Sequence, residues 1–489
     1  SDDLRRHLEG LPVEARPEST AYRLGKFVRR HRAAAAAAAV AALSLAVGFG
    51  VALHEAGIAR AHEAVAKKRL EDVRALANTL LFELNESLVP VPGTTKAREL
   101  LVRRGLEYLQ RLDPKSGPED LALQRDVAAA YQRLADLQGG GNASLGDVEG
   151  ARKSLAKAVE LRERTAASPA ATLEDRLNLA RARSSLAETL APNSEEALRL
   201  TEAAVKVAEE ALALAPSNEN VRKRLAIVLD TRAMVLTQRS DFEGALSVRR
   251  REAELFDLLA ARPGATDNDR RNQALVSRYL ASLYDRLGRL ADAERENRRA
   301  VEIDEARLAA APRNAETMVD ASHSLRSLAT FLRRSNRSVE ALPHAERAAA
   351  LAGEVAAKDP ADVGAQLAAL RARLQVAQTH TSLGRFREAR AMILDGIARL
   401  ESLARAGVTA GRLPGEFGAY RSALAETWFA QMDAVRGEEK AAVRREAVAA
   451  YEAARRTFAE MERLGQLGPT DRVLRDTTVR RLAELAEAR

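Results

Sequence analysis

The stretch LASLYDRLGRLADAERENRRA, residues 280–300, decides the fold of this chain. Its small residues Ala281, Ala293 and Ala300 stand at helical spacings on either side of Gly288. Two antiparallel helices joined by a short turn approach closely only where both carry small residues, and glycine suits the left-handed position that ends a helix. The stretch therefore predicts a helical hairpin whose turn lies at Gly288.

The hairpin pattern recurs along the chain with a period of 48 residues. One column of alanines begins the predicted second helices, and another lies twelve residues earlier, in the first helices. The motif Leu-Gly-Arg-x-x-x-Ala, where x is any residue, occurs around Gly288 and around Gly384. Hairpins of this kind bury their apolar faces by stacking on their neighbours. The columns are Ala233, Ala281, Ala329 and Ala377, and Ala245, Ala293, Ala341 and Ala389.

The period extends into an array of about seven helix pairs at residues 119–464, followed by a capping helix at 470–489. Prolines between the pairs mark places where a helix must end. Aromatic residues make up only 4% of the chain, and no segment shows the period-two alternation of a strand. We predict an all-α, right-handed solenoid of long hairpins with first helices on its concave face. The predicted pairs are 119–167, 172–215, 217–261, 266–311, 314–358, 360–405 and 414–464.

The hairpin pattern is similar to the tetratricopeptide repeat. That family combines a Leu/Gly pair, a Tyr, two alanines seven residues apart and a terminal Pro. The family's period is about 34 residues, so the period of 48 implies helices longer by several turns. Glu252 and Gly396 replace the second alanine in two repeats. The residues that carry the match are Leu280, Ala281, Tyr284, Gly288, Ala293, Ala300 and Pro312.

An uncharged run at residues 33–53 precedes the repeats. At 1.5 Å of rise per residue, a helix of this length spans about the 30 Å of a bilayer's hydrocarbon core. Basic residues crowd the segment before the run, whereas the first one after it is Arg60. We predict one span of an inner or plasma membrane, with a cytoplasmic N-terminus and extracytoplasmic repeats. The alternative is an alanine-rich soluble helix; a cleaved signal peptide would have a shorter apolar run.

Three segments precede the array: a basic cytoplasmic stub at residues 1–32, the predicted span at 33–53, and membrane-proximal helices at 54–113. The helical pattern continues to about Val89, and a second helix is predicted from about Thr95. Two interpretations of its apolar stripe remain open: packing on the first repeat, or pairing with a second copy in a dimeric coiled segment. The stripe consists of Val73, Leu76, Leu80, Leu84 and Leu88.

The sequence lacks the motifs of a catalytic or metal centre. It has no cysteine, its seven histidines show no paired ligand spacing, and it contains neither a nucleophile elbow nor a phosphate-binding loop. We therefore predict no enzyme activity and no cofactor in this chain. The net charge of +8 comes from intermixed basic and acidic residues without interleaved aromatics, which argues against a nucleic-acid partner.

The basic stub carries a second resemblance. Residues 3–17, DLRRHLEGLPVEARP, and 22–32, YRLGKFVRRHR, resemble the juxtamembrane linker of bacterial eukaryotic-like serine/threonine protein kinases. In that family an ATP-dependent kinase domain precedes the linker, and one membrane helix and a tetratricopeptide array follow. The resemblance implies a regulatory or sensor region whose kinase domain lies before Ser1. The alternative is a scaffold that assembles a complex or itself without a kinase.

Eight residues of the predicted concave face are candidates for ligand binding. Arg278 and Arg326 are 48 residues apart, as are Arg286 and Arg334, so they stack as two basic rows. Because guanidinium groups pair well with carboxylates, we expect a protein or an acidic peptide, or a C-terminal carboxylate, as the ligand. The alternative is a solvated face neutralised by neighbouring acids. The candidates are Arg278, Ser282, Asp285, Arg286, Arg326, Thr330, Arg333 and Arg334.

Overall fold

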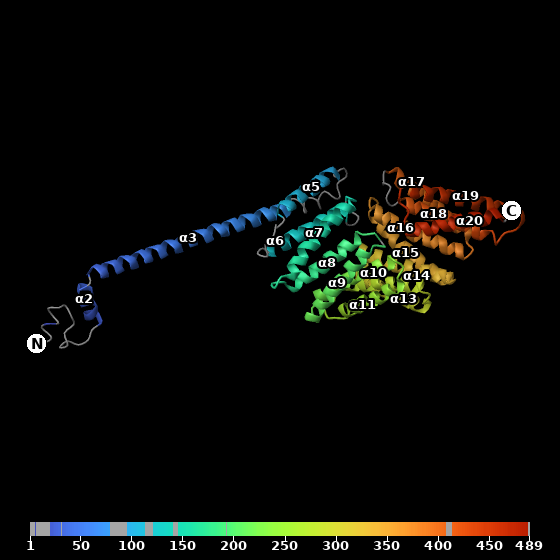
Figure 1. The fold of residues 1–489 in the computed structure, drawn as a ribbon. Helices are drawn as coiled ribbons and strands as arrows, with labels where there is room; N and C mark the ends of the chain where they lie inside the picture. Colours follow the sequence, from blue (N-terminus) through green and yellow to red (C-terminus); the bar gives the residue numbers. More distant parts are fainter. Residues whose placement is uncertain are drawn as a thin grey trace. The chain divides into compact units, whose positions relative to one another are not determined.

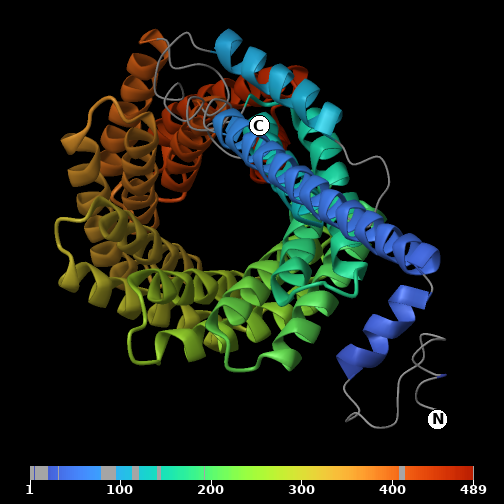
Figure 2. The same ribbon diagram turned by 90° about the vertical axis from the view of Figure 1, so that its left-hand side faces the viewer.

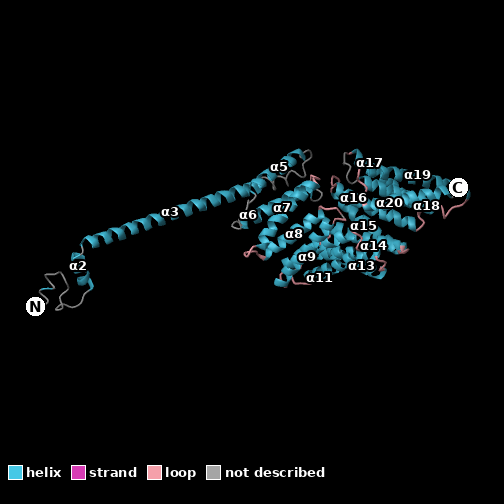
Figure 3. Cartoon of the chain, viewed as in Figure 1, coloured by secondary structure: helices cyan, strands magenta, loops and turns pink. Residues whose placement is uncertain are grey.

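The computed structural model describes residues 5, 20–30, 32–78, 95–112, 121–139, 145–191, 193–406 and 413–487. Within these ranges every regular element is an α-helix, and there is no strand, which confirms the predicted all-α class (Figures 1 and 3). The chain divides into two compact units, residues 1–108 and 109–489, which are described separately.

The first unit contains α2 (Thr20–Arg30), the 47-residue helix α3 (Arg32–Asn78), and most of α5 (Thr95–Leu112). Residues 32–58 of α3 are long and apolar enough to cross a membrane, and none of this stretch is buried. Leu45, for example, is 75% exposed. This is one candidate membrane helix, by length and composition. Residues 79–94, which include the predicted end of this helix and three of the five residues of its apolar stripe, lie outside the described residues.

The second unit is a succession of helical hairpins. Its described residues form seven consecutive pairs and the capping helix α20, and Figure 2 shows that the pairs follow a curved path. These are α6 (Leu121–Gly139), α7 (Val148–Ala167), α8 (Leu173–Glu188), α9 (Glu195–Leu214), α10 (Glu219–Gln238), α11 (Phe242–Ala260), α12 (Asp267–Arg286), α13 (Leu290–Ala310), α14 (Ala315–Arg334), α15 (Ser338–Lys358), α16 (Val363–Ser382), α17 (Phe386–Arg405), α18 (Leu413–Gln431), α19 (Gly437–Arg463) and α20 (Pro469–Glu487).

The alanine columns form the contact between the two helices of each pair. Ala281 on α12 and both Ala293 and Ala300 on α13 are buried, and so are their counterparts in the neighbouring repeats. Tyr284 and other large side chains fill the core beside them. Close packing of this kind confirms the solenoid of tetratricopeptide-like hairpins.

Consecutive first helices pack more closely than consecutive second helices. From α12 through α14 and α16 to α18, each first helix contacts the next. Because the inner side of a curved array is the shorter one, helices that lie there come closer together. The first helices therefore line the concave side of the array and carry the predicted ligand-binding face.

Candidate functional site

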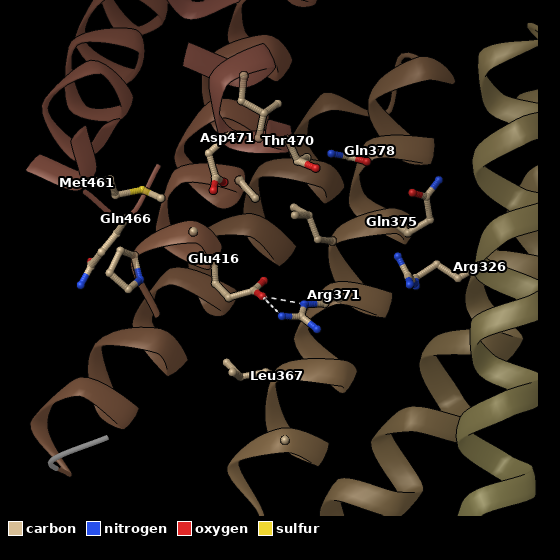
Figure 4. Close-up of a pocket in the computed structure, with 16 residues that line it drawn as sticks. Arg326, Leu367, Arg371, Gln375, Gln378, Glu416, Met461, Gln466, Thr470 and Asp471 are labelled. Atoms are coloured by element: carbon tan, nitrogen blue, oxygen red, sulfur yellow. Dashed lines mark hydrogen bonds and ion pairs between the residues drawn. The ribbon is translucent and has the colours of Figure 1, made fainter. Parts of the chain in front are cut away.

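The candidate site lies on the concave side, where consecutive first helices carry arginines. Arg278 belongs to α12, Arg326 to α14 and Arg371 to α16. A cavity of about 750 Å³ opens beside Arg326 and Arg371, and Figure 4 shows both side chains extending toward the same space. Other lining residues come from α16, α18 and α20, and include Leu367, Gln375, Glu416 and Asp471.

Arg326 is a half-buried cation without a counter-ion. Within the described part of the chain its guanidinium makes no hydrogen bond or ion pair. Burial lowers its pKa, repulsion from Arg371 and Arg278 adds to the effect, and attraction to Glu416, which pairs with Arg371, offsets part of it. Burial, together with Arg278 and Arg326, also lowers the pKa of His323 on the same helix to about 4, so this imidazole is neutral at pH 7. An anion bound here would offset the repulsion among the arginines.

Neighbouring polar groups are only partly satisfied. Arg371 donates from Nε to Oε1 of Glu416 at 2.6 Å. Gln375 is 7% exposed, and its Oε1 accepts a hydrogen bond from the Thr330 hydroxyl at 3.1 Å. Its Nε2 is buried and has no partner. The cavity wall thus offers a guanidinium and an amide donor, which suit an oxygen ligand with negative charge.

The structure treats the two predicted basic rows differently. Arg278 and Arg326 lie close enough to repel each other, and neither is neutralised by an ion pair among the described residues. In the other row, Arg334 forms a 2.5 Å ion pair with Asp285, and Arg286 lies 5.3 Å from the ring centre of Phe242. The first row is therefore the better candidate for binding an anion.

The remaining predicted residues lie at the edge of this row. Thr330 holds Gln375 in place, and Ser282 is exposed on α12. Arg333 donates to Gln378 at 3.5 Å, while its Nε is buried without a partner. Burial and the neighbouring Arg334 lower the pKa of Arg333.

The sequence reasoning missed the part of the site that α16 contributes. Its side chains face α14 at an offset of 45 residues, one helical turn less than the 48-residue period. A search at that shorter offset would have found them. The pairs are Arg326 with Arg371, Thr330 with Gln375, and Arg333 with Gln378.

Among the described residues, no cluster of His, Asp or Glu side chains could hold a metal ion. No protein-family model matches the chain. No curated protein matches it either.

Several solved structures are similar to this chain. BtubC (BKLC) from P. vanneervenii is 18% identical with a TM-score of 0.39, over 53% of this chain and 91% of that one. Aspartyl phosphate phosphatase F from Bacillus subtilis is 13% identical with a TM-score of 0.40, over 83% and 93%. The apo quorum sensor NprR from B. thuringiensis is 12% identical with a TM-score of 0.44, over 76% and 87%. The function proposed below rests on this chain's own residues.

Proposed function

We propose that this chain is a membrane-anchored repeat region that binds a protein or peptide on the concave face of its solenoid. The observation that carries this proposal is Arg326, a half-buried guanidinium without a counter-ion beside a cavity. A half-buried charge without an ion pair of its own is costly, so its place is best explained by a ligand that supplies an acid. A carboxylate matches the planar fork of arginine donors.

We further propose that the chain is anchored in a membrane and that it regulates a kinase. The exposed apolar residues of 32–58 support a membrane span, and the basic residues before them support a cytoplasmic N-terminus. The resemblance of residues 3–32 to a kinase juxtamembrane linker supports a regulatory role, in which the repeats bind outside the cell and inform a kinase inside.

Peptide arrays test the binding function. We expect the chain to retain acidic peptides, and Arg326→Glu to abolish this binding. The matched control is Arg295→Glu, because Arg295 is an exposed arginine on the second helix α13. Acidic peptides that bind the Arg326→Glu variant as well as the original chain would contradict the proposed site.

The regulatory role has a separate test. In a longer protein with a kinase domain before Ser1, deletion of residues 109–489 should change kinase activity. Unchanged activity would favour the scaffold.

A further inference from the structure

The second helices of the array are linked by ion pairs that recur with the repeats. Arg347 of α15 pairs with Glu305 of α13, with 2.7 Å between Nε and Oε1. The same two positions pair at the two preceding junctions, 48 and 96 residues before. In each pair the partners are 42 residues apart and join one second helix to the next. The earlier pairs are Arg299 with Asp257 and Arg251 with Glu209.

Two more ion pairs reinforce the junction between α13 and α15. Arg298 pairs with Glu340 at 2.5 Å, and Arg337 pairs with Glu294 at 2.7 Å. Single exposed ion pairs contribute little to stability, but several at one junction fix its geometry together. The outer side of the array is therefore cross-linked from α9 to α15.

The next junction, between α15 and α17, has lost these links. No ion pair between these two helices occurs among the described residues. Asp395 pairs instead with Arg373 of α16 and with Arg399 of its own helix. Glu346 and Glu388 carry like charges at positions that form an ion pair one repeat earlier. The replacements are Gly353 for Glu305, Asp395 for Arg347 and Glu346 for Arg298, whereas Glu388 retains the glutamate of Glu340.

A cavity of about 670 Å³ lies at this weak junction, between α15, α16 and α17. Its lining includes Ala349, Gly353 and Ala369, and a Cβ added to Gly353 would meet no atom within 4 Å. The largest apolar core cluster begins in α8 and reaches Val376 of α16, and Met392 of α17 packs both against it and against the cluster that follows. Between α15 and α17 the junction thus lacks ion pairs among the described residues and holds a cavity, while buried alanines keep α15 in contact with α16.

The concave site spans this same junction. Arg326 belongs to the α14/α15 pair, whereas Arg371 belongs to the α16/α17 pair. On the concave side, hydrogen bonds such as that from Thr330 to Gln375 hold α14 against α16. This inner edge can act as a pivot, because no ion pairs join α15 to α17 on the outer side among the described residues. Repulsion between the two arginines opposes close approach across the pivot.

We propose that an oxyanion held between Arg326 and Arg371 is the link that fixes this junction. The inference rests on the proposed function, because the oxyanion is the acidic group of the bound ligand. Its oxygens accept hydrogen bonds from both guanidiniums and remove their repulsion. Without the anion the two halves of the array rotate about the pivot; with it they adopt one arrangement. Ligand binding thereby selects a shape of the array.

Spin-label distances in the full chain, held in nanodiscs, test this inference. The sequence has no cysteine, so introduced pairs are labelled without background. Val339→Cys with Leu394→Cys reports across the weak junction, because both positions are exposed on α15 and α17. Ala291→Cys with Glu346→Cys reports on the equivalent positions one repeat earlier. We expect a broader distance distribution at the weak junction, which narrows to the reference width when tetra-glutamate peptide or inorganic phosphate is added.

Two variants separate the site from the junction. Arg326→Gln should abolish the narrowing and weaken tetra-glutamate binding by at least about tenfold, since a charge-assisted hydrogen bond is lost. Glu346→Arg places an arginine opposite Glu388, as in the pair Arg298–Glu340 one repeat earlier. This variant should narrow the distribution at the weak junction without any anion.

Equal widths at the two junctions before anions are added would overturn the inference. Binding of tetra-glutamate without narrowing would also overturn it, while the proposed binding function would stand. Narrowing by phosphate in a chain that binds no acidic peptide would support the anion link and contradict the proposed function.

Discussion

At the scale of single residues, Glu252 shows how one repeat departs from the pattern. It stands where neighbouring repeats have Ala204 and Ala300, yet it is only 3% exposed. Its carboxylate accepts a 2.6 Å hydrogen bond from Arg249, which also lies 4.3 Å from the ring centre of Tyr279. Burial raises the pKa of Glu252 above its ordinary value. A buried ion pair thus replaces small-residue packing in this repeat.

Removing one partner of this pair should cost more than removing both. Glu252→Ala leaves Arg249 buried with a weaker set of partners, so we expect the free energy of unfolding to fall by about 2–4 kcal/mol. Arg249→Leu combined with Glu252→Ala should lie within about 1 kcal/mol of the original chain. Urea unfolding at constant m-value measures both changes. A double variant as unstable as the single one would contradict this prediction.

The same pair gives a pH dependence. Because the pKa of Glu252 is raised in the folded state, the unfolded carboxyl loses its proton first as the pH rises above 4.5. The original chain should therefore lose stability relative to the double variant between about pH 4.5 and neutrality. A parallel pH profile for the two proteins would show that Glu252 keeps its ordinary pKa.

At the scale of elements, the hairpin turn has one demanding position per repeat. Gly288 and Gly384 both have φ of 72°, as the Leu-Gly-Arg motif predicts. Ser240 and Asn336 occupy the equivalent positions with φ of 63° and 64°. The next residue closes the turn in each case, for example by a 2.8 Å hydrogen bond from Arg289 N to Tyr284 O. The left-handed conformation suits glycine, is tolerated by Asn and strains Ser.

Substitutions at this position should have opposite effects on stability. We expect Ser240→Gly to raise the free energy of unfolding by up to about 1 kcal/mol, and Gly288→Ala to lower it by about 1 kcal/mol. The control is Gly353→Ala, because Gly353 lies inside α15 with open space around it and should gain stability. Thermal unfolding measures all three. A stabilising Gly288→Ala would show that the turn is not strained by a side chain.

At the scale of the whole molecule, the exposed apolar part of α3 predicts the topology. In intact spheroplasts, a membrane-impermeant maleimide should label Val473→Cys on α20 but should label Arg29→Cys only after permeabilisation. This expectation follows from the basic residues before the candidate span, because basic residues beside a membrane helix favour the cytoplasmic side. The absence of native cysteine removes background labelling. Equal labelling of both positions before permeabilisation would contradict the predicted orientation.

The sequence by itself determined the hairpins and their order. Small residues at fixed spacing can be buried only between two close helices, so the columns through Ala281 and Ala293 specify which helix faces which. The turn at Gly288 and the row of Arg278 and Arg326 follow from the same period. These features depend on contacts within a repeat or on exact repetition between repeats, and both can be recognised from the amino-acid sequence.

Only the tertiary structure decided how neighbouring repeats meet. The crossing of α14 over α16 shifts their contact by one turn, which brings Arg371 rather than a residue at the 48-residue period opposite Arg326. The same packing gave Arg334 a partner in Asp285 and left Arg326 without one. The sequence alone could not show that Arg334 is paired and Arg326 is not. Whether an arginine is neutralised depends on which acidic side chains the packing of neighbouring repeats brings within reach.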